Sequence, residues 1–509
     1  MSEDYIRIYD TTLRDGEQTP GVTLTPQNKV KIAIQLDKIG VDVIEAGFPI
    51  ISQGEMDVVK EIAKQNLSCN ISGLARVEKK DIDAIMKCDL KYVHTFIATS
   101  DIHLKYKLKK TREEVLQKAI EAVEYAKSHG LVCEFSAEDA TRTDREFLKQ
   151  VYMAVVDAGT DRIDVPDTVG YSNPKYINTL ISYLRTTIKV PISIHCHDDF
   201  GLAVANSITA IEAGASCAHV TINGLGERAG NASLEEFVMA LHCLYGMKTR
   251  IKTQLLYETS RIVSSLTGIV VQPNKAIIGE NAFGHESGIH THGVLSNPLT
   301  YEPINPEMVG RKRWLEAGKH AGVHGVSAML EEYGLAPSEQ QLKEILIKIK
   351  DLGDKGKNIT EADLLVITSQ VMQQEGLEER IKLNDFVVTT GMNVVPTASV
   401  RLIIEGKEFV AADTGLGPVD AGLKAIQKIT DEIANIKLRE FRLESITGGS
   451  DALAEVSIKV EDNDGHISSA RAAGEDIVIA SVQAMINGLN RIMLKRTMDK
   501  DKELRKYTV

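Results

Sequence analysis

Two histidines one residue apart, His195 and His197, stand near the end of an apolar run. Alternate side chains of a β-strand point to the same face, so both imidazoles should emerge together while Cys196 points away. Two neutral imidazoles on one rigid face provide half of a site for a divalent metal ion. The expected third ligand is Asp15, from another strand end, with Asp10 as the lower-ranked alternative.

Two histidines and one carboxylate leave coordination positions open for substrate or water, which a catalytic metal site needs. These donors do not choose among zinc, manganese and magnesium. Asn231, in a glycine-rich segment, is expected to add a weak oxygen ligand or to orient a bound water. Arg14 adjoins Asp15, and a guanidinium beside a metal stabilises an oxyanion. A non-haem iron oxygenase uses the same donor set and is a competing hypothesis.

The first half of the chain alternates strand-like runs with helical stretches. One helix is expected over Thr111–His129, where Thr111 and Glu114 form a capping box and Gly130 supplies the stop. Eight strand-like runs are Tyr5–Asp10, Val43–Pro49, Cys69–Leu74, Tyr92–Thr99, Val132–Asp139, Arg162–Asp167, Pro191–His197 and His219–Asn223. Eight strand–helix units in about 240 residues predict an α/β fold, the (β/α)8 TIM barrel. A doubly wound open sheet is the alternative, which the lack of a phosphate-type glycine fingerprint disfavours.

Polar residues gather at the expected strand ends, where the active sites of such barrels lie. They are Arg14, Asp15, Glu45, His94, Thr99, Ser136, Glu138, Asp139, Asp167, Thr168, His195, His197 and Asn223. Packing alone does not explain carboxylates, imidazoles and hydroxyls at the same end of so many strands. The sequence therefore predicts an active site at the mouth of the barrel.

The second half of the chain has a different pattern. Residues from about 245 to 385 look mostly helical, and short alternating strands follow from about residue 390. Two parts of this region resemble each other, which indicates an internal repeat: 398–404 followed by 415–425, and 454–460 followed by 474–484. The predicted domains are a catalytic TIM barrel over residues 1–270, helical linker subdomains over 271–388, and an α+β regulatory domain over 389–509.

Composition narrows the class of protein. A net charge of −12 without a basic patch argues against nucleic-acid or anionic-membrane partners. No apolar stretch reaches the roughly 20 residues that cross a membrane, and the charged start of the chain is unlike a signal peptide. The 6 cysteines contain no CxxC pair and suit reduced thiols, so a cytoplasmic location is expected.

A histidine-rich segment, Gly284–His292, lies outside the predicted barrel. Its three histidines are compatible with a second metal site or with a segment that carries an acid/base histidine over the active site. The residues alone leave this choice open. Tyr301, taken by itself, is expected to be a packing residue.

Three long segments, Asp10–Gln18, His195–Ala203 and Asn223–Asn231, resemble the signatures of the 2-isopropylmalate, homocitrate and citramalate synthase family. The resemblance extends over nearly the whole chain, including the repeated C-terminal domain. It implies condensation of acetyl-CoA, as co-substrate, with a 2-oxo acid on a divalent metal ion.

The resemblance also implies roles for single residues. Asp15, His195 and His197 resemble the metal ligands, with Asn231 nearby. Arg14 resembles the arginine that faces the oxo-acid oxygen. The remaining roles are carboxylate binding by Thr168, substrate binding by His94 and Ser136, and acid/base chemistry by Glu138 and His290 with Tyr301 alongside. Many relatives have Gln-Asp where this chain has Thr291-His292, so a role for that aspartate does not carry over.

Within the family, the segments 45–49, 94–100 and 165–171 look most like isopropylmalate synthases, and homocitrate synthases of the simplest type lack the C-terminal repeat. The resemblance implies a homodimer that uses 3-methyl-2-oxobutanoate in leucine biosynthesis. Leucine is the expected effector, with Gly415, Gly417 and Asp420 as the candidate effector loop, and isoleucine is the alternative. (R)-citramalate synthase and homocitrate synthase are the alternative activities. A sensing protein with an inert barrel is disfavoured because the metal ligands are intact.

Overall fold

The structure is a computed structural model, and it describes residues 5–315, 317–318, 320–332, 335–354, 359, 361–372, 380–431, 436–445, 454–463, 465–474 and 476–506. The chain forms two compact units. The first comprises Met1–Gly284 and Glu302–Arg313, and the second comprises His285–Tyr301 and Trp314–Val509. The predicted division at residues 270 and 388 stays a prediction.

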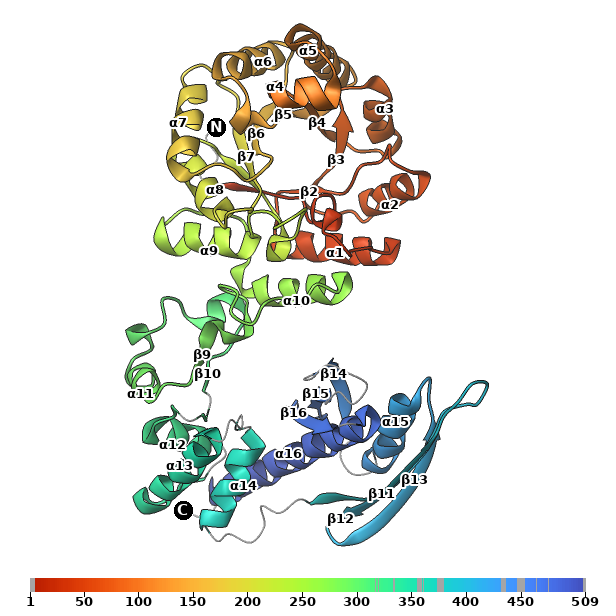
Figure 1. Cartoon of the computed structure of the whole chain (residues 1–509), viewed down its shortest axis with the longest axis vertical. Coiled ribbons are helices and arrows are strands. Elements are labelled where there is room, and N and C mark those ends of the chain that lie inside the picture. Colours follow the sequence, from red (N-terminus) through yellow and green to blue (C-terminus); the bar gives the residue numbers. More distant parts are fainter. Residues whose placement is uncertain are drawn as a thin grey trace. The chain divides into compact units, whose positions relative to one another are not determined.

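The first unit contains a closed barrel of eight parallel strands in chain order, so the TIM-barrel prediction is confirmed and the open sheet is wrong (Figure 1). The strands are β1 Arg7–Asp10, β2 Val43–Glu45, β3 Asn70–Arg76, β4 Tyr92–Ala98, β5 Val132–Glu138, β6 Arg162–Asp167, β7 Ile192–Cys196 and β8 Cys217–Val220. The predicted eighth strand is displaced: it begins at Cys217, which pairs with Arg7 of β1, and it ends at Val220, before the turn at Ile222–Gly224.

Helices surround the strands in Figure 1. They are α1 Pro26–Ile39, α2 Gln53–Ala63, α3 Lys79–Lys87, α4 Asp101–His103, α5 Arg112–Ser128, α6 Arg145–Asp157, α7 Pro174–Arg185, α8 Ala203–Glu212, α9 Leu234–Leu244 and α10 Leu256–Thr267. The predicted capping box of Thr111 and Glu114 starts α5. Gly40 ends α1 at φ 101°, a left-handed conformation that glycine adopts without strain.

The two faces of the barrel strands differ in chemistry. Outward residues such as Ile8, Ile163 and Ile194 are buried in one apolar core with the helices. Several inward residues are buried and polar or charged: Tyr9, Glu45, His94, Glu134, Ser136, Asp164, Ser193, His195 and His219. Because strand side chains alternate, this pattern fills the interior of the barrel with polar groups. Several side chains of the site described below are among these inward residues.

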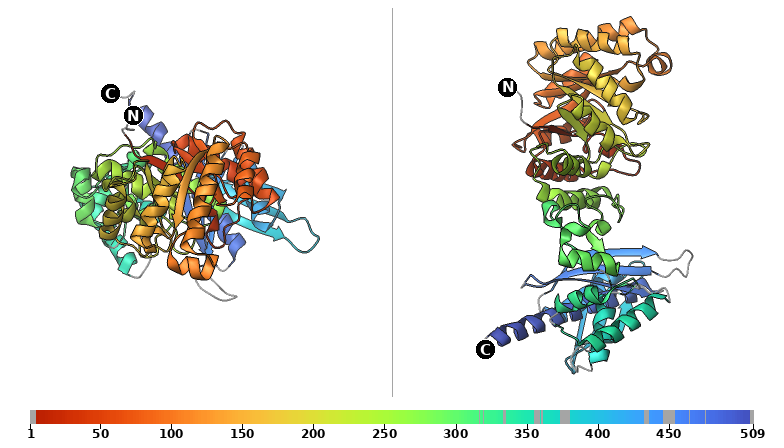
Figure 2. Two further views of the ribbon diagram at one scale, coloured as in Figure 1. Left: turned by 90° about the horizontal axis from the view of Figure 1, so that it is seen from above. Right: turned by 90° about the vertical axis from the view of Figure 1, so that its left-hand side faces the viewer.

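The second unit contains β9 Gly284–His285, α11 Gly288–Ser296, β10 Trp314–Leu315, α12 Val323–Glu332, α13 Glu339–Asp354 and α14 Glu361–Met372. Two antiparallel three-stranded sheets follow, β11 Ile381–Thr389, β12 Thr397–Ile404 and β13 Lys407–Thr414, then β14 Lys437–Ser445, β15 Ala454–Glu461 and β16 Ile467–Gly474. Each sheet precedes one helix, α15 Pro418–Thr430 or α16 Ile477–Lys506 (Figure 2). The strand region therefore starts at Ile381, earlier than predicted.

This arrangement confirms the predicted internal repeat within the described residues. Both copies contribute to one apolar core, which joins Val400 and Ile426 of the first copy to Val456 and Ile486 of the second. None of the described helices is both long and apolar enough to cross a membrane.

Candidate active site

A cavity of about 230 Å³ opens where the barrel strands end. Its walls carry most of the site residues that the sequence predicts in the barrel. The lining residues are Arg14, Asp15, Gln18, Phe48, Leu74, His94, Phe96, Ser136, Glu138, Asp164, Pro166, Thr168, His195, His197 and Glu227.

Three of these side chains converge on one point. Oδ2 of Asp15 lies 3.3 Å from Nε2 of His195 and 3.7 Å from Nε2 of His197. The two Nε2 atoms are 3.4 Å apart, and all three residues are buried. Cys196 between the histidines faces the apolar core, as the strand alternation predicts.

The donors in this triad fit a divalent metal ion. Asn231 pairs with His197 through a β-bridge, and its Nδ2 atom donates to the carbonyl oxygen of Leu225. This bond leaves the buried Oδ1 atom of Asn231 without a hydrogen-bond partner among the described residues. A buried amide oxygen on the residue that pairs with His197 is a suitable further oxygen donor for a divalent ion held by the triad.

The electrostatics favour the protonation states that metal binding needs. Burial alone would raise the pKa of Asp15, but the Arg14 guanidinium and His195 hold this pKa well below its usual range. Burial and the neighbouring His195 lower the pKa of His197 to about 4. At neutral pH, therefore, Asp15 is a carboxylate and His197 is a neutral imidazole.

Arg14 is held between two carboxylates. Its Nη1 atom lies 3.1 Å from Oδ2 of Asp15, and its Nε atom donates to Oε2 of Glu45 over 2.6 Å. Oε1 of Glu45 is hydrogen-bonded to Nδ1 of His94 at 2.6 Å. The sequence indicated Glu45 only as a polar strand end, and its position between Arg14 and His94 was missed.

His94 continues into a polar chain inside the barrel. Its Nε2 atom is 2.6 Å from Oγ of Ser136, and that hydroxyl donates to Oδ2 of Asp164. Asp164 was also missed. Its signal was the alternation along β6, which turns Arg162, Asp164 and Pro166 to the same face.

The predicted residues Glu138 and Thr168 lie at the ends of β5 and β6. Glu138 Oε1 accepts a hydrogen bond from Nζ of Lys107, and Oγ1 of Thr168 accepts one from the backbone N–H of Asp139 over 2.9 Å. Both residues line the cavity that contains the triad.

Four apolar residues line the same cavity: Phe48, Leu74, Phe96 and Pro166. Phe48 and Phe96 contact edge to face, with ring centroids 6.4 Å apart. The sequence by itself indicated no role for these residues, although Leu74, Phe96 and Pro166 occupy inward positions of predicted strands. The cavity thus places an apolar surface beside charged groups.

His290 and Tyr301 belong to the second unit, whereas the residues that line the cavity belong to the first. Their rings contact each other, with centroids 4.2 Å apart. His292 lies 4.6 Å from His324, also between ring centroids. Among the described residues, no group that could hold a metal ion includes histidines of this segment.

The candidate effector loop begins α15. Gly417 caps this helix, and the backbone N–H of Leu416 donates to Oδ2 of Asp420 over 2.9 Å. Gly415 is tightly packed, since a Cβ atom there would lie 2.3 Å from the backbone nitrogen of Ala421. The loop is thus compact, and its role as an effector site stays a prediction.

Comparison with known proteins gives three family matches in chain order. A model described as HMGL-like matches residues 5–263, one described as homocitrate synthase post-HMGL domain-like matches 277–357, and one described as LeuA allosteric (dimerisation) domain matches 358–493.

Relatives match nearly the whole chain. A "2-isopropylmalate synthase" of Methanocaldococcus jannaschii is 56% identical over 97% of this chain and 96% of its own. A "Probable 2-isopropylmalate synthase" of Methanopyrus kandleri is 55% identical over 97% and 99%. A relative from Methanothermobacter thermautotrophicus, named as an (R)-citramalate synthase, is 48% identical over 96% and 98%.

Proposed function

The chain belongs to the 2-isopropylmalate synthase family of acetyl-CoA-dependent acyltransferases, and from that premise we propose that it condenses acetyl-CoA with 3-methyl-2-oxobutanoate to form 2-isopropylmalate. This is the first committed step of leucine biosynthesis. Relatives with this name are more similar to the chain than the citramalate synthase at 48% identity. The oxygenase hypothesis is set aside because the family performs acyl transfer.

The observation that carries the proposal is the convergence of Asp15, His195 and His197 in a cavity that also contains Arg14 and an apolar surface. These three residues, with Asn231, would hold a zinc, manganese or magnesium ion. The chemistry that such an ion would supply is Lewis-acid polarisation of the C2 carbonyl of the oxo acid.

Arg14 orients the C2 oxygen and stabilises the negative charge that develops on it during attack. Because Glu45 and Asp15 already hold its guanidinium, little reorganisation is needed at the moment of reaction. Thr168 binds the carboxylate of the oxo acid, and His94 and Ser136 line the substrate cavity. The isopropyl group of the substrate packs on the apolar surface.

Glu138, His290 and Tyr301 form the proposed acid/base set. A base in this set removes a proton from the methyl group of acetyl-CoA, and the new carbanion attacks C2 of the oxo acid. The C2 oxygen becomes a hydroxyl group, and water then hydrolyses the thioester to release CoA and the dicarboxylic acid. Hydrolysis of the thioester makes the overall reaction irreversible.

We also propose that the chain is a cytoplasmic homodimer and that leucine inhibits it through residues 389–509. The match of residues 358–493 to an allosteric and dimerisation domain supports this proposal. The loop that contains Gly415, Gly417 and Asp420 is the proposed leucine contact, with isoleucine as the alternative effector.

The test is an assay of free CoA with pyruvate, 3-methyl-2-oxobutanoate or 2-oxoglutarate, each with and without leucine or isoleucine. The expected result is the highest kcat/KM with 3-methyl-2-oxobutanoate and inhibition by leucine. Preference for pyruvate would make the chain a citramalate synthase, and preference for 2-oxoglutarate a homocitrate synthase. Absence of CoA release with all three acids would overturn the proposal.

A further inference from the structure

A second group of side chains whose donor atoms could hold a metal ion lies inside the barrel, apart from Asp15 and His197. It consists of Glu134 on β5, Asp164 on β6 and His219 on β8. One donor atom from each residue lies within 4.8 Å of the others, and all three residues are buried. We call these residues the inner cluster.

The inner cluster is held in place on several sides. Nε2 of His219 lies 3.1 Å from Oε1 of Glu134, and the His219 ring stacks on Tyr9 with centroids 4.1 Å apart and an interplanar angle of 16°. Oδ2 of Asp164 accepts the hydrogen bond from Ser136. Donor atoms on strands of one closed barrel therefore have little freedom to move apart.

The second carboxylate oxygen of Asp164 is an acceptor that no described side chain uses. This Oδ1 atom is buried and has no hydrogen-bond partner among the described residues. Asp164 itself is only 1% exposed. A buried acceptor without a partner loses its hydration, which costs about 1–3 kcal/mol, and more if the group is charged.

The negative charge of the inner cluster also favours a bound cation. Two carboxylates with a neutral imidazole carry a formal charge of −2 in the barrel interior. The guanidinium of Arg162 lies near Glu134 and within 3.4 Å of Oγ of Ser216, and it contributes one positive charge. Burial opposes a proton on His219, but Asp164 and Glu134 raise its pKa above the usual value; such a proton would add positive charge and would still leave Oδ1 of Asp164 without a partner among the described residues. A divalent cation compensates the charge and also occupies that oxygen.

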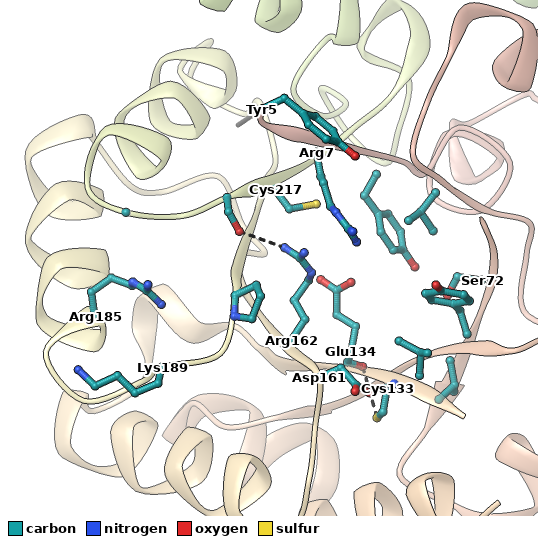
Figure 3. Close-up of a pocket in the computed structure, with 18 residues that line it drawn as sticks. Tyr5, Arg7, Ser72, Cys133, Glu134, Asp161, Arg162, Arg185, Lys189 and Cys217 are labelled. Carbon is teal, nitrogen blue, oxygen red and sulfur yellow. Dashed lines mark hydrogen bonds between the residues drawn. The ribbon is translucent and has the colours of Figure 1, made fainter. Parts of the chain in front are cut away.

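The cluster has its own route to solvent. A cavity of about 490 Å³ penetrates the barrel from the N-terminal ends of the strands, and Glu134 is one of its lining residues. Figure 3 shows Glu134 and Arg162 projecting into this cavity, with Arg7 nearby. The cavity at the C-terminal ends has different lining residues, so an ion can reach Glu134 without passing Asp15.

We propose that Glu134, Asp164 and His219 bind a second divalent metal ion of the first transition row, such as Zn²⁺ or Mn²⁺, which crosslinks β5, β6 and β8 inside the barrel. Two carboxylates and one imidazole are a suitable donor set for such an ion. Its role is structural, because the cluster lies behind Ser136 and does not reach the substrate cavity except through Asp164. Binding of this ion does not depend on which oxo acid the enzyme uses as substrate.

The experiment counts metal ions on the full-length chain. The protein is stripped with a chelator, reloaded with Mn²⁺ or Zn²⁺ and analysed by elemental mass spectrometry and by the shift in Tm. The wild type should bind two ions per chain and His197→Ala one. Glu134→Gln and Asp164→Asn should each remove the inner ion and keep the Asp15 site.

The matched control is Asp167→Asn. Asp167 is also a buried aspartate of β6, but it is hydrogen-bonded to Thr141 and Ser172 outside the cluster. This variant should retain two ions. One ion in the wild type and none in His197→Ala would overturn the proposal, and this comparison remains decisive if an inner-cluster variant does not fold.

Discussion

The Nε atom of Arg14 donates a hydrogen bond over 2.6 Å to Oε2 of Glu45, a carboxylate of β2 with no exposed surface. The other oxygen of Glu45 binds Nδ1 of His94 at the same distance, 2.6 Å. One buried carboxylate thus orients two side chains that line the substrate cavity, although Glu45 is not itself among the described lining residues.

Glu45→Gln should therefore lower catalysis without emptying the metal site. Glutamine has no negative charge and offers one acceptor oxygen in place of two, so Arg14 or His94 loses its alignment. We expect kcat/KM to fall about 10²-fold or more, as when one oxyanion donor is lost. The measurements are steady-state CoA release and bound metal per chain.

A matched control for this change is Asp42→Asn. Asp42 is also a buried carboxylate of the barrel unit, and its Oδ2 atom accepts a hydrogen bond from the backbone N–H of Ile8 over 2.8 Å outside the substrate cavity. It should lower Tm with little change in kcat/KM. An equal loss of activity in both variants would contradict the positioning role of Glu45.

His197→Ala should abolish metal-dependent CoA release, because the variant lacks one of the two imidazoles of the triad. Chelation of the wild type should have the same effect, and added Zn²⁺ or Mn²⁺ should restore the wild type only. Cys196→Ala is the neighbouring control, since Cys196 faces the apolar core. Full turnover after rigorous chelation would refute the metal assignment.

Leu74→Ala should change substrate choice. Leu74 contributes to the apolar surface of the cavity, and one methylene or so in such a pocket is worth about 1–3 kcal/mol. We expect kcat/KM for 3-methyl-2-oxobutanoate to fall about 10-fold or more. The ratio of the kcat/KM values for the two acids should shift in favour of the larger 4-methyl-2-oxopentanoate. An unchanged ratio between the two acids would show that the substrate side chain lies elsewhere.

Asp10 should make stability depend on pH. Burial raises the pKa of Asp10 to about 7, above its value of about 3.9 in an unfolded chain. The folded protein therefore holds this proton more tightly, and the stabilisation is present below about pH 4 and is lost as the pH rises towards 7. Asp10→Asn does not titrate, so its Tm relative to wild type should be higher at pH 8 than at pH 5. A Tm difference independent of pH would contradict the shift.

Gly415→Ala should weaken feedback inhibition. An added Cβ would press on the backbone of Ala421, whereas the matched position Gly417 has nothing within 4 Å of an added Cβ. We expect the leucine concentration for half inhibition to rise about 10-fold or more in Gly415→Ala, equivalent to a coupling loss of about 1–2 kcal/mol. Gly417→Ala should change it less, and basal kcat should be unchanged in both. Equal leucine sensitivity in Gly415→Ala and wild type would argue against this loop.

Much of the fold followed from local patterns. The capping box at Thr111, the stop at Gly130 and the alternation of strand and helix all depend on residues close together in the chain, so the barrel was predictable. The start of β8 was predicted too late, at His219, because no local feature of the sequence marks Cys217 as the first residue of the strand. Strand limits depend on pairing with β1 and β7, which are distant in sequence.

The sequence alone determined that His195 and His197 point to one face, because alternation is a property of the strand itself. It also indicated Asp15 and Arg14 as their partners, through motifs with a family resemblance. Only the tertiary structure decided that Glu45 connects Arg14 to His94 and that Glu134, Asp164 and His219 meet inside the barrel. Those contacts join residues on different strands, and the pairing register between strands, which no local pattern encodes, sets which inward side chains come within a hydrogen bond of each other.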